Sequence, residues 1–172
     1  MLFNFFSRFI NSQFITYVIR CLIGFLIGYL LILYFTGIDL FWALLSIILV
    51  ISPEENQAKK LTIDRFKSNF LGSLSGLIVF LLEIEDIYKV ILGIIVTCVL
   101  CRIFDLLNVA RSAIVALLII LLEHKGDGIM SPIIRFGSVA LGCFIGLGVT
   151  LTTSAFIQFF NKNVFNKPST NN

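Results

Sequence analysis

Four arginines that lie within or beside apolar stretches are the residues best suited to chemistry in this 172-residue chain. They are Arg20, Arg65, Arg111 and Arg135. Guanidinium groups keep their charge and form bidentate hydrogen bonds with carboxylates. An arginine at the centre of a membrane helix costs about 2.5–3.5 kcal/mol, so one that stays there faces a pore, a partner or the headgroups. We predict that the four arginines bind a small organic anion and that Trp42 offers it a flat apolar surface; the ordinary alternative is anchoring of these side chains at the membrane surface.

Signs of catalysis or of a bound cofactor are weak. The sequence has no HExxH motif, no glycine-rich phosphate loop and no cluster of intramembrane carboxylates. The four cysteines lie in apolar stretches, and the pair Cys98 and Cys101 lacks a second ligand pair, which favours apolar packing over a metal or redox site. The single histidine, His124, is expected in a solvated loop. We therefore expect neither enzymatic activity nor a cofactor.

The amino-acid composition of the chain is that of a protein embedded in lipid rather than surrounded by water. Hydrophobic residues make up 58% of the chain and charged residues only 13%, and the mean hydropathy is +1.01. A soluble domain carries about 25% charged residues, and disordered chains combine low hydrophobicity with high net charge. The 13 Lys and Arg residues are dispersed, which argues against nucleic-acid binding. The sequence thus predicts an integral, all-α membrane protein in a lipid bilayer.

A membrane span needs about 20 mostly apolar residues, with charges tolerated near its ends. The sequence offers six candidates, of which the first and last are the strongest and the second, fourth and fifth have shorter uncharged runs. We expect spans at Phe14–Phe35, Leu40–Ile51, Phe66–Leu82, Ile87–Phe104, Leu106–Leu122 and Ile133–Phe160. Residues 14–160 would form the membrane domain, preceded by an interfacial segment over 1–13 and followed by a polar tail over 161–172.

Charge placement predicts the orientation. With six spans and the N-terminus inside, 10 of the 13 basic residues fall on the cytoplasmic side, and acidic residues collect in the outer loops. Both termini are therefore expected in the cytoplasm. Asp64 beside Arg65, and Asp105 near Arg102, could neutralise their neighbours.

An internal repeat relates the two halves of the chain at an offset of 70 residues. Residues 65–76 read RFKSNFLGSLSG and residues 135–146 read RFGSVALGCFIG, so Arg65 corresponds to Arg135, and the match extends back to Ala43 and Ala113. Each repeat would hold three spans, and an odd number inverts the second copy relative to the first. Inverted repeats are common in transporters, with the substrate site near mid-membrane at their interface. This arrangement would place Arg65 at the inner mouth and Arg135 at the outer mouth.

Three glycine pairs have the spacing that lets membrane helices approach closely. They are Gly24 and Gly28, Gly72 and Gly76, and Gly142 and Gly146. We expect helix packing from these residues rather than contact with a substrate.

These features resemble the membrane module of the fusaric acid resistance (FUSC)-type transporters, within the wider aromatic acid exporter group. The resemblance covers about residues 15–155 and is carried by Trp42, the Ser52–Pro53 turn, Arg65 and Arg111, and the glycine pairs after Arg65 and Arg135. It implies export or channel-like passage of organic, possibly aromatic, carboxylates across a bacterial inner membrane. It also implies a homo-oligomer, with a dimer favoured. Longer members carry large cytosolic domains, for which six spans would leave no room here.

Two other functions remain open at this point. The chain could be a non-transporting membrane subunit or assembly factor, with the arginines as anchors and the glycines as docking faces. It could also be a membrane-embedded enzyme, which the lack of catalytic motifs makes the weakest of the three.

Overall fold

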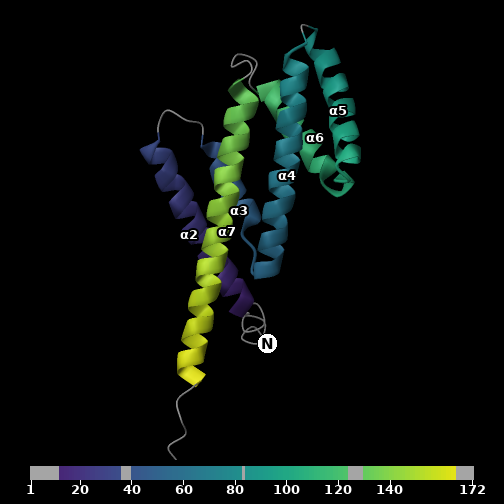
Figure 1. The fold of residues 1–172 in the computed structure, drawn as a ribbon. Helices are drawn as coiled ribbons and strands as arrows, with labels where there is room; N and C mark the ends of the chain where they lie inside the picture. Colours follow the sequence, from purple (N-terminus) through teal and green to yellow (C-terminus); the bar gives the residue numbers. More distant parts are fainter. Residues whose placement is uncertain (1–11, 36–39, 83, 124–129, 166–172) are drawn as a thin grey trace, which may run out of the picture.

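The computed structural model describes residues 12–35, 40–82, 84–123 and 130–165, and the regular elements in these ranges are all helices (Figure 1). The elements are α2 (Ser12–Tyr34), α3 (Phe41–Val50), α4 (Glu55–Phe80), α5 (Asp86–Ile103), the 3-10 turn η1 (Leu107–Val109), α6 (Ala110–Glu123) and α7 (Met130–Phe165). The predicted all-α fold is confirmed for this part of the chain. The expectations for His124, for most of segment 1–13 and for the end of the tail fall outside the described residues, whereas α7 runs five residues past the predicted end at Phe160.

Helix α4 begins 11 residues before the predicted start at Phe66. Low hydropathy suggests a loop here, but the segment ENQAKKLTIDR is rich in residues with high helix propensity. Glu55 and Lys59 also form an i,i+4 ion pair of 2.7 Å, which stabilises the first turns. The expectation that Arg65 lies at a helix start is therefore wrong, because a polar helical extension precedes it.

Only α2 and α7, among the described residues, are both long and apolar enough to cross a membrane by themselves. Helix α3 has 10 residues and α6 has 14, which at 1.5 Å per residue is about 15 and 21 Å against a hydrocarbon core of about 30 Å. Helix α4 has the length, but its first half is polar. The structure thus contains two long apolar helices with shorter or more polar ones packed beside them.

Glycines allow several pairs of helices to approach closely. Helix α3 packs on α7, and α4 packs on both α6 and α7. A Cβ on Gly142 would collide with the carbonyl oxygen of Ala43, and one on Gly72 would lie 2.6 Å from that of Ala113. In lipid, packing of this kind replaces the hydrophobic effect as the force that holds helices together. The short helices α3 and α6 thus pack against the glycine-containing faces of the longer helices α7 and α4.

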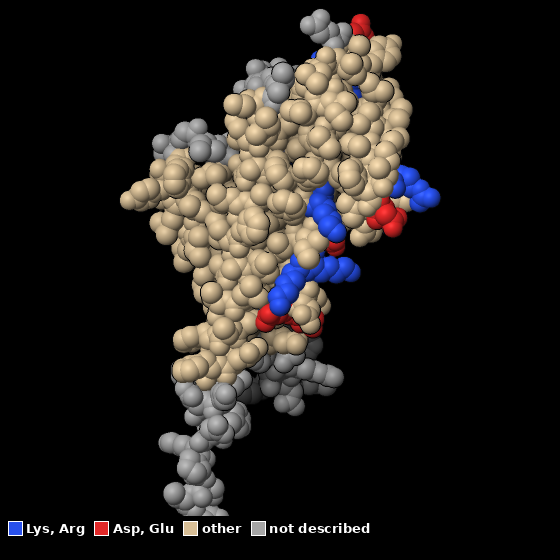
Figure 2. Space-filling model, in the orientation of Figure 1, with Lys and Arg blue, Asp and Glu red and all other residues tan. Residues whose placement is uncertain are grey.

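The two long central helices, α4 and α7, run in opposite directions and lie side by side (Figure 1). Phe66 of α4 and Phe136 of α7 meet edge to face with their ring centroids 5.2 Å apart. Figure 2 shows that most of this face of the molecule is uncharged, and that the charged side chains gather toward its lower and right-hand part. The first half of α4 contributes Lys59, Lys60 and Lys67 to the charged residues of the chain.

Candidate functional site

A cavity of about 240 Å³ lies among four helices and collects most of the predicted anion-binding residues. Its wall includes Trp42 from α3, Arg65 from α4, Arg111 from α6 and Arg135 from α7. None of the described residues that line it is acidic. Three arginines from three helices therefore line one small space, and its described wall carries only positive formal charge.

Arg135 is the most buried of the three, with only 5% of its surface exposed. Its guanidinium carbon lies 3.6 Å from the centre of the Trp42 ring. A cation over an aromatic face at this distance is attracted by the ring quadrupole, and more strongly when water is excluded. Trp42 thus fixes Arg135 at one wall of the cavity and stabilises its charge there. The indole nitrogen of Trp42 is itself buried and has no hydrogen-bond partner among the described residues.

Arg65 is half-buried and is held from the α3 side. Its Nε donates a hydrogen bond of 3.3 Å to the Ser46 hydroxyl, which in turn donates to the Trp42 carbonyl at 2.7 Å. On α4 the carbonyl of Arg65 accepts hydrogen bonds from Ser68 and Asn69 at 3.0 and 2.9 Å. Among the described residues this is the one hydrogen bond of the Arg65 guanidinium, whose fork carries further N–H donors that can serve a ligand.

Arg111 and Ser112 occupy the first turn of α6 and are both exposed. The turn η1 runs directly into α6, and the Ala110 N–H donates to the Leu107 carbonyl, so the positive charge at this wall comes from the Arg111 side chain. Ser112, Ser68 and Asn69 also line the wall, and none of the three is predicted as a site residue from the sequence. The repeat offers a signal for Ser112, because this residue lies 70 positions after Trp42 and so corresponds to it in the second half of the chain.

Arg65 and Arg135 do not lie at opposite mouths, as the repeat leads one to expect, because both line the same cavity. The reason is that α4 starts early, which moves Arg65 ten residues into the helix, while Arg135 lies five residues into α7. Neither Asp64 nor Asp105 forms a salt bridge with its neighbouring arginine within the described residues. The neutralisation considered for Arg65 is therefore not seen.

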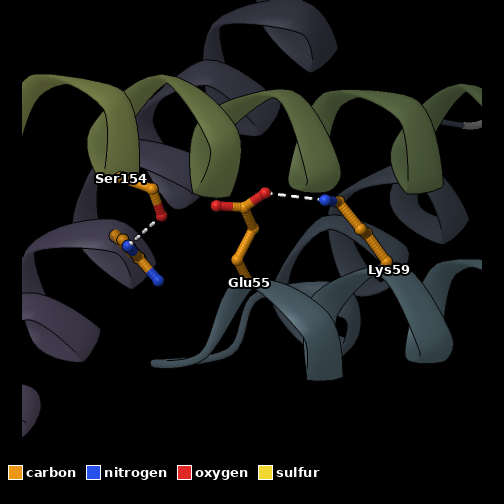
Figure 3. Close-up of polar contacts among 4 residues, drawn as sticks. Glu55, Lys59 and Ser154 are labelled. Carbon is orange, nitrogen blue, oxygen red and sulfur yellow. Dashed lines mark hydrogen bonds and ion pairs between the residues drawn. The ribbon is translucent and has the colours of Figure 1, made fainter. Parts of the chain in front are cut away.

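Arg20 lies apart from this cavity. It is 3% exposed, and its guanidinium donates hydrogen bonds to Ser52, Pro53, Thr153 and Ser154. Figure 3 shows the bond to Ser154 beside the Glu55–Lys59 ion pair. The structure thus brings together Trp42 and three of the four predicted arginines. The fourth, Arg20, forms its hydrogen bonds with protein groups outside the cavity.

One comparison with known proteins gives a match. The family model described as fusaric acid resistance protein-like matches residues 23–149, which is more than half of the chain and includes every cavity residue named above. No curated protein and no solved structure matches. The family and the apolar helices together indicate a membrane location and a transporter class that is generally non-enzymatic.

Proposed function

The chain belongs to the fusaric acid resistance protein-like family, and from this premise we propose that it transports organic carboxylate anions by way of the cavity among Arg65, Arg111 and Arg135. The single observation that carries the proposal is that three arginines from three helices, Arg65, Arg111 and Arg135, line one cavity. Family membership suggests efflux or resistance transport and leaves the substrate open.

The charge balance of the cavity explains why an anion is the preferred ligand. A buried or partly buried cation is costly unless an opposite charge accompanies it. A carboxylate entering the cavity would accept charge-assisted hydrogen bonds from guanidinium groups, which are about twice as strong as neutral ones. The volume is below the roughly 300–1,000 Å³ of sites for drug-sized ligands, so a small acid is the expected cargo.

The architecture proposed for transport is a pair of inverted three-helix repeats. Two observations support it. The contact of Gly142 with Ala43 is repeated, 70 positions away, by the contact of Gly72 with Ala113. The equivalent helices α4 and α7 also run in opposite directions, as do α3 and α6 (Figure 1). The cavity then lies at the repeat interface, where transporters of this design hold their substrates.

Flux through the purified protein tests the proposal directly. In proteoliposomes we expect uptake of a small carboxylate such as benzoate, and of an aliphatic acid such as succinate, well above empty liposomes. The neutral isostere benzamide should show no protein-dependent flux, because it cannot pair with guanidinium. Protein-dependent flux of benzamide equal to that of benzoate would contradict selection of the cargo by the guanidinium groups. No flux of any carboxylate, together with co-purification of one stoichiometric partner, would instead favour the non-transporting subunit.

We also propose that both ends of the chain lie in the cytoplasm, in a bacterial inner membrane. Basic residues occupy the first half of α4 and the end of α5, whereas Glu85 caps α5 and Asp86 begins it, at the opposite end of α4. Excess Lys and Arg mark the cytoplasmic side. A C-terminal GFP fusion should therefore fluoresce and a C-terminal alkaline phosphatase fusion should be inactive, while a cysteine at Glu85 should react with an impermeant thiol reagent from outside intact cells. Active phosphatase at the C-terminus would reject this topology.

A further inference from the structure

Helix α3 packs on α7 in the same way as α6 packs on α4. A Cβ on Gly142 would collide with the carbonyl oxygen of Ala43, and a Cβ on Gly72 would meet that of Ala113. In both pairs the second obstacle is the Cβ of the residue three positions further along the short helix, at 2.8 Å. Each residue of one pair lies 70 positions from its counterpart in the other. The two helix pairs can therefore be compared position by position.

In each pair an arginine of the long helix lies with the first turn of the short helix. In the α3–α7 pair these residues are Arg135 and Trp42, whose guanidinium carbon and ring centre are 3.6 Å apart. In the α4–α6 pair the corresponding residues are Arg65 and Ser112, which line the same cavity. The two pairs thus differ in the side chain that the short helix contributes beside the arginine, which is an indole ring in one pair and a hydroxymethyl group in the other.

The position of the cavity follows from this difference. In the α3–α7 pair the Trp42 ring packs against the buried side chains of Val139 and Cys143. In the α4–α6 pair the position that corresponds to Val139 is Asn69, and Asn69 lines the cavity. Trp42 and Arg135 apart, the described residues around the cavity all belong to α4 and α6. The cavity therefore lies largely where the serine side chain would be if it were as large as the indole.

The first turn of α6 also carries a charge where that of α3 carries a ring. Phe41 and Trp42 meet edge to face at the start of α3, with their ring centroids 5.6 Å apart. Their counterparts on α6 are Arg111 and Ser112. The hydrogen bond that Arg65 donates leaves from the Nε edge of its guanidinium, whereas stacking on a π system uses the flat face. The α4–α6 pair therefore offers a guanidinium face and a second guanidinium group to a molecule that is both flat and acidic.

We propose that Ser112 is the specificity-determining residue of the cavity. Its small side chain leaves open, over Arg65, the space that an indole fills over Arg135. A flat acid stacks there on Arg65 with its carboxylate toward Arg111, so Arg65 receives from the ligand the aromatic partner that Arg135 has within the protein. A larger residue at position 112 would compete with the ligand for this space. This inference rests on the proposed function in taking the cavity as the binding site of the transported acid.

Filling the space with an indole tests its position without any ligand. Ser112→Trp is combined with Trp42→Phe, so that the introduced indole is the single tryptophan of the full chain, which is studied in detergent. We expect acrylamide from the water and a brominated detergent from the apolar side to quench the introduced indole to within twofold of native Trp42. Ile95→Trp combined with Trp42→Phe, on the exposed face of α5, should be quenched by the brominated detergent at least threefold more strongly.

Titration calorimetry of the same detergent-solubilised protein tests the specificity. Ser112→Leu fills part of the space and should weaken benzoate binding at least tenfold, because the flat ring has to enter that space. Succinate binding should weaken less than threefold, since its flexible chain can pair with the arginines without stacking on Arg65. Ser112→Ala, which removes the hydroxyl without adding bulk, should cost less benzoate affinity than Ser112→Leu. Ala155→Leu adds the same bulk at an exposed position of α7 outside the cavity and should leave both affinities within twofold of the parent.

Three results would overturn the role of Ser112. The first is an introduced indole that is quenched as strongly as that of Ile95→Trp. The second is an equal change, or no change, in benzoate and succinate binding in folded Ser112→Leu, and this variant decides if Ser112→Trp does not fold. The third is a loss in Ser112→Ala as large as that in Ser112→Leu, which would assign the effect to the hydroxyl rather than to size. A selective loss of benzoate binding in Ser112→Leu, in a protein that moves no carboxylate in liposomes, would reject the proposed function and leave this inference standing.

Discussion

Replacement of Arg135 by glutamine is expected to lower carboxylate flux by about tenfold to a hundredfold. A hydrogen bond to a charged group contributes about 1.5–3 kcal/mol, and each 1.4 kcal/mol is a factor of ten. Arg135 is buried at the cavity wall against Trp42, so its charge is poorly screened by water or salt. Arg65→Gln should have an effect of the same order, because Arg65 lines the same cavity. Initial rates of benzoate uptake into proteoliposomes measure both.

Matched control variants separate the effect of the cavity arginines from that of other positive charges of the protein. Lys60→Gln removes an exposed positive charge from the same helix as Arg65 and should leave flux within twofold of the parent. Arg135→Lys keeps the charge but loses bidentate geometry and should recover only part of the rate. If Arg65→Gln and Arg135→Gln, both folded, transported benzoate as fast as Lys60→Gln, the cavity would not be the path of the anion.

Trp42 gives an independent view of binding, because it is the single tryptophan of the chain. All tryptophan emission therefore reports the ring that Arg135 covers. Titration with succinate, which does not absorb in the near ultraviolet, should change the emission of the parent in a saturable way. The change should be weaker by about tenfold in apparent affinity in Arg65→Gln, where the Trp42–Arg135 stack is intact. An emission that does not respond to succinate while flux is normal would place the binding site elsewhere.

The sequence predicts where the helices lie along the chain better than how they pack against one another. Hydropathy locates both ends of α2, α3 and α5 to within two residues and those of α7 to within five, because polar or charged residues bound each apolar run. It misses the first 11 residues of α4, where helix propensity and an ion pair, not apolarity, decide the structure. This one error also misplaces Arg65, since the position of a residue along a helix depends on where that helix begins.

The candidate site is predictable in its charged members and not in its neutral ones. Arg65, Arg111 and Arg135 stand out because charge is rare in this chain. Ser112 and Asn69 do not, since a small polar residue becomes part of a wall only once helices from both halves are packed. For Arg20 the residue type alone gives a misleading prediction. Its residue type suggests an anion ligand, but its acceptors are 32 to 134 positions away in the sequence, and only the fold brings them to it.

The second large effect is expected at Gly142. A Cβ at this position would clash with the carbonyl oxygen of Ala43 and lie 2.8 Å from the Ser46 Cβ. The first obstacle is backbone, so no rotamer change relieves it and α3 must move as a body. Overpacking of a well-packed contact typically costs about 1–3 kcal/mol. Gly142→Ala should therefore lower the stability of the protein in detergent by at least this amount, measured as a fall in its thermal unfolding midpoint.

Two glycines of the same helix provide the comparison. A Cβ on Gly137 or on Gly148 would meet no atom within 4 Å, so Gly137→Ala and Gly148→Ala should unfold at or above the temperature of the parent, because alanine has the higher helix propensity. Gly72→Ala should behave like Gly142→Ala, since it meets the Ala113 carbonyl oxygen at 2.6 Å. Equal midpoints for Gly142→Ala and Gly137→Ala would show that α3 does not pack against α7 in this way.

Gly142→Ala should also change the structure of the cavity wall. Trp42 is adjacent to Ala43 on α3, and Arg135 lies seven residues before Gly142 on α7, so a body movement of α3 away from α7 separates the indole ring from the guanidinium that covers it. In Gly142→Ala we therefore expect altered Trp42 emission before any unfolding, together with reduced benzoate flux. Gly72→Ala, which displaces α6 rather than α3, should lower flux with the emission unchanged. That difference follows only if Trp42 is held in place through the contact between α3 and α7.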